Sequence, residues 1–329
     1  MIEAFSHAPD LPRGDPALLN KVAWKSRWED RLKSVTYAKA ALEHTGPDPS
    51  KHLKVARGYA LVTLAWQAKW RGDFDASLAF SLEAETLLSE KDHPDARAHV
   101  YSILGVLHYS RNRLDLATCA TDRGLKIAEP DKNTDAFVDL LLTRATILRY
   151  KGDRSRAGLS LGRARDIAEG AELARVEHNI ARWMLSDDAF ELGKKHSKTS
   201  LDLCERHANR VVLPYTYEVL GACHVDLHNF ECAKAAFVKG LDLAISDKDF
   251  RAQCQIIQRY AALEYARGKL DRARDLNCYG AEIAAQIDYA LWGREFALSL
   301  AQIYEDLGDL KSALSAHKRA WRFEKDRRT

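Results

Sequence analysis

The chain has 329 residues, of which 46% are hydrophobic and 29% charged, so it can fill a core and is not intrinsically disordered. With only 17 glycines and 8 prolines, the composition favours helices. Lys and Arg (50) nearly balance Asp and Glu (47), and the net charge of +3 argues against a general nucleic-acid binder.

Further features of the chain bear on its compartment. No apolar run approaches the roughly 20 residues of a membrane span, and the first residues lack the basic-then-apolar pattern of a signal peptide. The six cysteines, at 119, 204, 223, 232, 254 and 278, form no CxxC pair, which indicates free thiols in a reducing compartment. We therefore expect a cytoplasmic protein.

Residues 1–15 are expected to form a loose extension, because Pro9 and Pro12 fall within them and Pro16 follows. From 16 to 328 one pattern recurs. A Gly, Asp or Asn turn precedes an anchor residue, a small residue stands three positions later, and another stands seven beyond that. The anchors fall at 31, 74, 114, 154, 190, 230, 270 and 310, in steps of 43, 40, 40, 36, 40, 40 and 40.

A further small residue stands nine positions before most anchors, as Ala65 does before Phe74 and Gly105 before Leu114. Each unit therefore predicts two antiparallel helices, A and B, which cross at the small residues. Turns such as Gly72-Asp73 supply a residue tolerant of left-handed dihedrals and a carboxylate that caps helix B.

Three segments carry a family resemblance: Leu104-Gly105-x2-His108, Leu220-Gly221-x2-His224 and Leu300-Ala301-x2-Tyr304. They resemble tetratricopeptide repeats (TPR), although the period is about 40 residues rather than about 34. The resemblance covers residues 16–328. It implies an all-α, right-handed superhelix, an α-solenoid of about eight TPR-like helix pairs whose A helices line a concave face.

The family's groove positions lie three residues before, and one, four and five residues after, the small residue of helix A. Here they gather aromatic and basic side chains in repeats two to five, which predicts a groove for an acidic or aromatic-bearing peptide or protein. The alternative is that these side chains pack between helices or face water. The predicted groove residues, two of them one turn upstream, are Trp66, Lys69, Trp70, Tyr109, Arg149, Tyr150, Arg175, His178, Arg182 and Tyr215.

Two patterns could carry chemistry. Gly158-Leu159-Ser160-Leu161-Gly162 matches the G-x-S-x-G motif of hydrolases but falls inside a B helix, where small residues serve helix packing. His224, His228 and Cys232 have metal-ligand spacing, yet His228 occupies the turn between two helices. We expect the chain to be no enzyme and to bind no metal or cofactor. The alternative interpretation is a hydrolase that uses Ser160 or a metal enzyme that uses the His224 cluster.

The final helix carries six basic and two acidic side chains over 318–328. It resembles the last helix of bacterial regulatory TPR arrays that are fused to GGDEF-type diguanylate cyclases. On that resemblance the chain is a regulatory sensor module that controls an output domain. The alternative is a standalone TPR adaptor whose last helix is a solvated cap, and Trp321 and Phe323 leave homodimerisation open.

Overall fold

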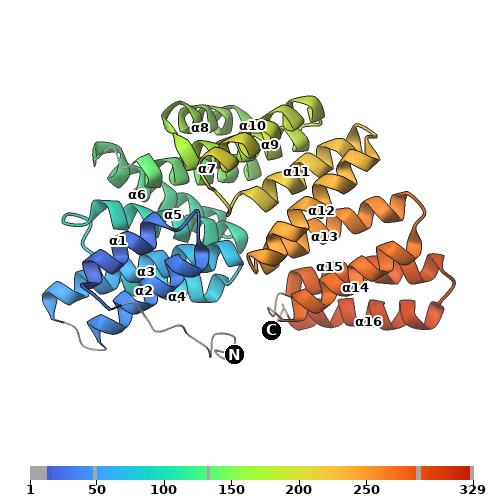
Figure 1. Ribbon diagram of the computed structural model, residues 1–329, viewed down its shortest axis with the longest axis horizontal. Helices are drawn as coiled ribbons and strands as arrows, with labels where there is room; N and C mark the ends of the chain where they lie inside the picture. The colour runs from blue at the N-terminus through green and yellow to red at the C-terminus, as the bar shows by residue number, and fades with distance from the viewer. Residues whose placement is uncertain (1–12, 47–49, 132–133, 287–289, 327–329) are drawn as a thin grey trace. The chain divides into compact units, whose positions relative to one another are not determined.

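The computed structural model describes residues 13–46, 50–131, 134–286 and 290–326 (Figure 1). Over these ranges the chain is all-α, with sixteen helices and no strand. The expected extension 1–15 lies, except for residues 13–15, outside the described residues. None of the described helices is both long and apolar enough to cross a membrane.

The chain divides into two compact units. Unit 1 comprises the residues up to Val176 together with Glu205–Val211, and unit 2 comprises Glu177–Cys204 and the residues from Val212 onward. The first eight helices are α1 (Pro16–Lys25), α2 (Arg31–Thr45), α3 (Lys51–Arg71), α4 (Phe74–Leu87), α5 (Pro94–Ser110), α6 (Leu114–Asp131), α7 (Thr134–Tyr150) and α8 (Arg154–Ile167). The next eight are α9 (Gly170–Ser186), α10 (Phe190–Arg206), α11 (Leu213–Asp226), α12 (Phe230–Ser246), α13 (Phe250–Ala266), α14 (Leu270–Gln286), α15 (Ala290–Asp306) and α16 (Leu310–Asp326).

All eight predicted anchors are the first residues of B helices, from Arg31 of α2 to Leu310 of α16. The expected capping is present. Gly72 takes a left-handed conformation (φ 85°) after α3, and the Asp73 carboxylate accepts from the amide of Ala76 at 3.1 Å. The prediction of an all-α array of eight helix pairs is confirmed, while the handedness of the superhelix stays a prediction.

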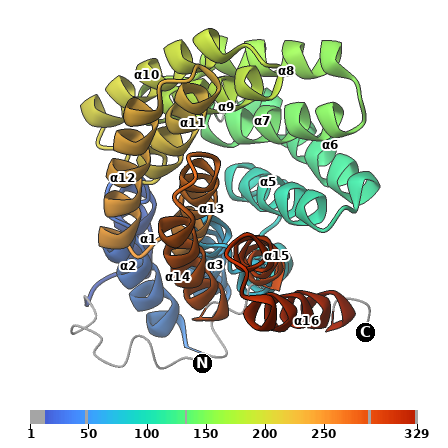
Figure 2. The same cartoon turned by 90° about the vertical axis from the view of Figure 1, so that its right-hand side faces the viewer.

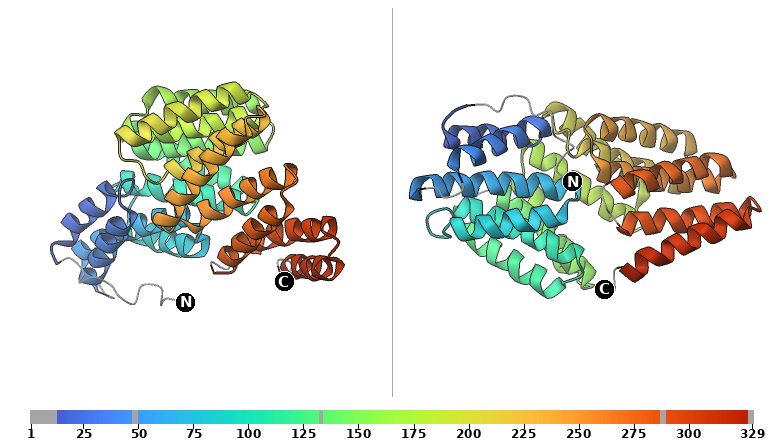
Figure 3. Two further views of the ribbon diagram at one scale, coloured as in Figure 1. Left: turned by 45° about the vertical axis from the view of Figure 1, so that its right-hand side comes forward. Right: turned by 90° about the horizontal axis from the view of Figure 1, so that it is seen from below.

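Successive helices of a pair pack closely, as α15 and α16 do (Figures 2 and 3). The small residues explain this closeness. A Cβ added to Gly105 of α5 would lie 2.6 Å from Oγ1 of Thr121 in α6, and one on Gly124 would meet Leu140 at 2.6 Å. The A helices α1, α3, α5 and α7 also contact one another in order, as do α11, α13 and α15 in unit 2.

The G-x-S-x-G segment corrects one expectation. Ser160 lies within α8, where its hydroxyl donates to the carbonyl of Arg156, so the segment is helical as predicted. Gly158 and Gly162, however, are exposed, and a Cβ on either would meet nothing within 4 Å. Helix packing does not explain these two glycines.

Unit 1 departs from a simple array in which each repeat contacts only its neighbours. Arg27 and Trp28 in the turn between α1 and α2 are buried, and the Trp28 carbonyl accepts from the amide of Arg210 at 3.0 Å. Arg27, in the same turn, donates to Asp135 of α7. The first, least regular repeat therefore contacts residues more than a hundred positions away.

Candidate ligand-binding site

The predicted groove residues differ widely in exposure. Five are buried: Trp66, Lys69, Arg175, His178 and Tyr215. Trp70, Tyr109 and Arg149 are half-buried, while Arg182 is exposed and Tyr150 is 66% exposed. The set is divided between the two units: His178, Arg182 and Tyr215 belong to unit 2 and the others to unit 1.

Within each unit the structure brings some of these residues together. In unit 1 the rings of Trp66 and Trp70 lie 5.8 Å apart, and Lys69 Nζ lies 5.7 Å and 5.6 Å from their centroids. The Tyr109 and Tyr150 rings are 5.4 Å apart. In unit 2 the rings of His178 and Tyr215 lie 6.5 Å apart, and the Tyr215 hydroxyl donates to Asp249 at 3.1 Å. Joint recognition of one ligand by all ten stays a prediction.

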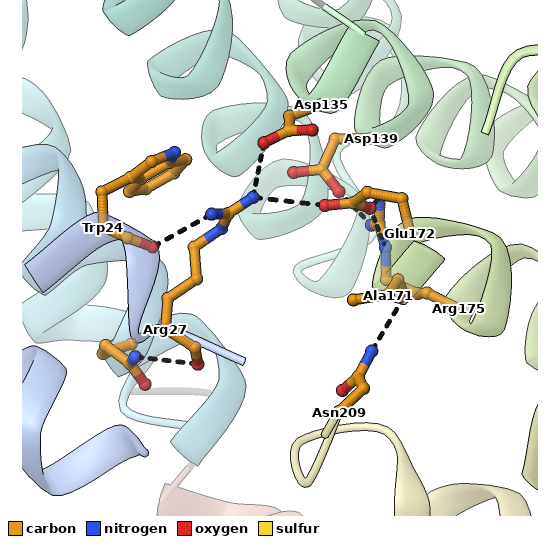
Figure 4. Close-up of polar contacts among 9 residues, drawn as sticks. Trp24, Arg27, Asp135, Asp139, Ala171, Glu172, Arg175 and Asn209 are labelled. Atoms are coloured by element: carbon orange, nitrogen blue, oxygen red, sulfur yellow. Dashed lines mark hydrogen bonds and ion pairs between the residues drawn. The ribbon is translucent and has the colours of Figure 1, made fainter. Parts of the chain in front are cut away.

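Five charged side chains form what we term the ion cluster of unit 1 (Figure 4). Arg27 Nη2 donates to Asp135 Oδ2 at 2.6 Å and to Glu172 Oε1 at 3.4 Å. Arg175 of α9 pairs with Glu172, Nη2 to Oε2 at 2.7 Å, and with Asp139 of α7. The ion cluster thus joins the turn after α1 to α7 and α9.

Four of the five members of the ion cluster are buried, so burial and the neighbouring charges both act on the pKa values of its carboxyl groups. Burial would raise the pKa of Asp139, but Arg175 and Lys69 hold that pKa below its usual value. Burial is the larger effect at Glu172 and raises its pKa in spite of Arg175. Lys69 and Arg175 therefore neutralise internal carboxylates.

Aromatic rings cover the cations of the ion cluster. The Arg27 guanidinium carbon lies 4.3 Å from the ring centroid of Trp24 and 5.4 Å from that of Trp28. The Arg175 guanidinium carbon lies 5.7 Å from the Trp28 ring. Cation–π contacts of desolvated groups reach about 2 kcal/mol, so these rings add to the stability of the turn between α1 and α2.

A cavity of about 820 Å³ opens beside the ion cluster, and we call it the α1 cavity. It is formed by successive A helices, with walls from α1, α3, α5 and the first turn of α7. Its volume suits a small molecule or a few residues of a peptide. Its lining includes Ala17, Asn20, Lys21, Trp24, Lys25, Arg27, Val55, Ala56, Tyr59, Val62, Thr63, Asp95, Ala96, His99 and Asp135.

Two buried side chains in this lining have incomplete hydrogen bonding. Asn20 is 7% exposed, and its Nδ2 donates to the Ala56 carbonyl at 2.8 Å. Within the described part of the chain, Asn20 Oδ1 and His99 Nδ1 have no partner. Buried polar atoms without partners cost free energy, so they favour a ligand that supplies the missing bonds.

The pKa of His99, another residue of the cavity lining, also departs from its usual value. Its ring is 6% exposed and stands edge-on to Trp24, with centroids 4.5 Å apart. Burial lowers the pKa of His99 to about 4, against the opposing pull of Asp139. The imidazole is therefore neutral at pH 7 and presents one donor and one acceptor.

The rival catalytic sites find no geometric support. Ser160 is buried in the middle of a helix rather than at the strained strand-to-helix turn that the hydrolase motif requires. His228 takes φ 58° in the turn between α11 and α12, so the spacing of the His224 cluster does not run along one helix. Among the residues the structure describes, no group of three His, Cys, Asp or Glu side chains is placed to hold a metal.

Comparison with solved structures, rather than with sequences, shows the fold class of this chain. No family model matches the sequence, and neither does any curated protein. A Rap protein complexed with competence and sporulation factor is 14% identical, with a TM-score of 0.65 over 94% of this chain and 98% of that chain. The apo form of the quorum sensor NprR from B. thuringiensis is 13% identical, with a TM-score of 0.62 over 97% and 90%.

A third structure is a signal transduction ATPase with numerous domains (STAND) from Pyrococcus horikoshii, which has a tetratricopeptide repeat sensor. It is 16% identical with a TM-score of 0.57, and the match covers 94% of this chain but 48% of that one. The present chain thus spans about half the length of that protein. At these identities the likeness shows the fold, and the chain is an all-α, TPR-like helix array.

The sequence analysis missed most of the α1 cavity, although a signal was present. Three cavity residues on α3, Val55, Tyr59 and Val62, stand ten, six and three positions before the small residue Ala65, and Asp95 and His99 on α5 stand ten and six before Gly105. Spacings of four and three keep side chains on one helix face. The same offsets select Asp95, His99, Asp135 and Asp139, whereas nothing in the repeat pattern selects Arg27.

Proposed function

We propose that this chain is a regulatory interaction module that binds a protein or peptide segment in the α1 cavity. The observation that carries the proposal is a cavity formed by successive A helices and lined by buried polar atoms that lack partners. One structural neighbour is complexed with a competence and sporulation factor and another is a quorum sensor, which supports such a role.

The regulatory part of the proposal follows from the position of the cavity beside the ion cluster. Arg27 lines the cavity and also bonds Asp135 and Glu172. A ligand seated against α1 therefore acts on the same turn that the ion cluster ties to α7 and α9. Ligand binding shifts the conformation of unit 1 to the extent that the ligand prefers one arrangement of this turn over another.

Several finer predictions from the sequence belong to this proposal. They are control of a fused diguanylate cyclase-like output domain, homodimerisation through the last helix, and a cytoplasmic location. A standalone adaptor remains the alternative. Binding of the predicted acidic partner now depends on Arg149 and Arg182, because Lys69 and Arg175 interact with the internal carboxylates of the ion cluster.

The proposal is tested by filling the cavity. Val55 is half-buried in the cavity wall, so Val55→Phe places extra volume inside, while Lys54→Phe on the exposed side of α3 serves as the matched control. A protein or peptide captured by the wild type should be lost with Val55→Phe and kept with Lys54→Phe. Binding of the purified partner is then measured by calorimetry, with folding checked by circular dichroism.

A parallel variant, Arg149→Glu/Arg182→Glu, separates this proposal from the groove predicted from the sequence. Retention of the partner by that variant and loss with Val55→Phe supports the α1 cavity. The reverse pattern overturns the assignment of binding to the cavity and favours binding at Arg149 and Arg182. A partner kept by both variants also contradicts the cavity.

A further inference from the structure

We infer that the ligand of the α1 cavity presents a basic group, an ammonium or a guanidinium, carried by a peptide segment. This inference rests on the proposed function and names the chemistry that the cavity selects. It differs from the acidic partner that the basic and aromatic residues predict from sequence. The argument depends on which polar atoms of the cavity are already engaged.

The cations in the cavity lining are not arranged to receive an anion. Arg27 is committed to Asp135 and Glu172 and is covered by the ring of Trp24. Lys21 and Lys25 are exposed, so their ammonium groups are solvated. An anionic ligand would have to displace an internal carboxylate to reach the one buried cation.

The remaining polar atoms are mainly hydrogen-bond acceptors. Asp95 accepts from the Tyr59 hydroxyl at 2.8 Å through Oδ1, and its Oδ2 has no partner among the described residues. Asp135 engages Arg27 through Oδ2 alone. Asn20 Oδ1 is a buried acceptor without a donor. Two carboxylates and an amide oxygen call for a ligand that donates several hydrogen bonds, as an ammonium or guanidinium does.

The other walls suit the rest of such a ligand. Val55, Ala56 and Val62 give an apolar side to the cavity, and the rings of Trp24 and Tyr59 line it as well. Aromatic rings attract a cation that is held near their faces, and apolar walls accept the neighbouring side chains of a peptide. The combination fits a basic residue flanked by apolar residues, or the amino terminus of an apolar segment.

The test measures binding of three pools of hexapeptides with amidated carboxyl termini to the full chain. One internal position is fixed as Lys, Gln or Glu, and the other positions vary among Ala, Val, Leu, Ser and Gly. Each pool is made with a free and with an acetylated amino terminus, which separates a side-chain ammonium from a terminal one. Binding is followed by calorimetry and by tryptophan fluorescence, since Trp24 lines the cavity.

We expect the acetylated Lys pool, or the Gln pool with a free terminus, to bind at least tenfold more tightly than the acetylated Glu pool. Asp95→Asn should remove most of that preference, because it deletes the charge and keeps an acceptor for Tyr59. Asp92→Asn is the matched control, since Asp92 is exposed and outside the cavity lining, and it should leave the preference intact. The preference should also shrink as salt is raised.

The outcomes separate the two proposals. Equal binding of all pools, acetylated and free, or a preference for Glu, overturns the basic-group inference. If that binding is still abolished by Val55→Phe, the proposed function stands. A preference for Lys that survives Asp95→Asn also contradicts the inference. If no pool binds, the proposed peptide-binding function fails and the inference fails with it.

Discussion

Glycines on the helices of unit 1 meet opposite environments. Gly105 stands where α5 crosses α6, and a Cβ there would press on Thr121 Oγ1 and on Thr143 Cγ2 at 3.2 Å. Gly158 on α8 is exposed, and a Cβ there would meet open space. The residue type in the sequence is the same, and only the packing decides what the glycine does.

The same substitution should therefore change stability in opposite directions. Gly158→Ala is expected to raise the free energy of unfolding by about 0.5–1 kcal/mol, because alanine restricts the unfolded chain and favours helix. Gly105→Ala should lower it by about 1–3 kcal/mol through overpacking. Urea unfolding followed by circular dichroism measures both, and a Gly105→Ala protein as stable as wild type contradicts the close packing.

His99 makes the stability of unit 1 depend on pH. Its folded pKa of about 4 is below the ordinary value of 6.5, so between these values the unfolded chain takes up a proton that the folded chain does not. Stability from this group is complete above pH 6.5 and falls as the pH falls toward 4, by about 1 kcal/mol per pH unit.

We expect His99→Gln to flatten this pH dependence between pH 6.5 and 4. His207→Gln, at an exposed histidine of the same unit, is the matched control and should leave the slope unchanged. The measurement is urea unfolding at a series of pH values. An unchanged slope in the His99→Gln protein would show that other groups carry the acid sensitivity.

Between helices, the ion cluster links elements that the repeat pattern does not join. Removing one partner of a buried ion pair leaves an uncompensated charge and typically costs about 3–5 kcal/mol. Arg175→Met should therefore destabilise unit 1 strongly, since it leaves Asp139 and Glu172 buried without their main cation.

Denaturant unfolding of Arg175→Met, of Asp139→Asn, of the double variant and of a control variant measures this effect. Lys126→Met, on an exposed residue of α6, should change stability by less than about 0.5 kcal/mol. Asp139→Asn should cost less in the Arg175→Met protein than in the wild type, because the two residues form one network. Full additivity of the two substitutions would falsify the coupling.

The helix pairs were predictable from the sequence because their cause is local and repeated. Turn residues, caps and small residues recur every 40 positions, so every anchor from Arg31 to Leu310 marked the start of a B helix. The ion cluster was not predictable, since Arg27 lies in the least regular repeat and its partners lie 108 and 145 positions away. The α1 cavity was partly predictable, because several of its residues, such as Val55, Tyr59 and Val62, share one helix face.

At the scale of the whole molecule, we expect truncation at the two ends to change the stability of α3–α8 by different amounts. Helix α16 contacts α15, and α15 contacts α14 and α13, so within the described part of the chain removal of residues 290–329 deletes near-neighbour interfaces alone. Removal of residues 1–49 deletes Arg27 and uncovers Asp135 and Glu172, which belong to the middle of the chain. Hydrogen exchange should show α3–α8 protected in the first truncation and largely unprotected in the second. Equal protection in both argues against a special role for the first repeat.

The contacts of the turn between α1 and α2 have a consequence for synthesis of the chain. Residues 26–30 leave the ribosome early, yet Trp28 bonds to Arg210 and Arg27 to Glu172. The chain up to Arg210 must therefore emerge before this turn reaches all of its native neighbours. Until then α3–α8 can pair as hairpins as they appear, while the turn keeps its arginine and tryptophan in water. The first repeat to be translated is thus expected to be the last part of unit 1 to complete its structure.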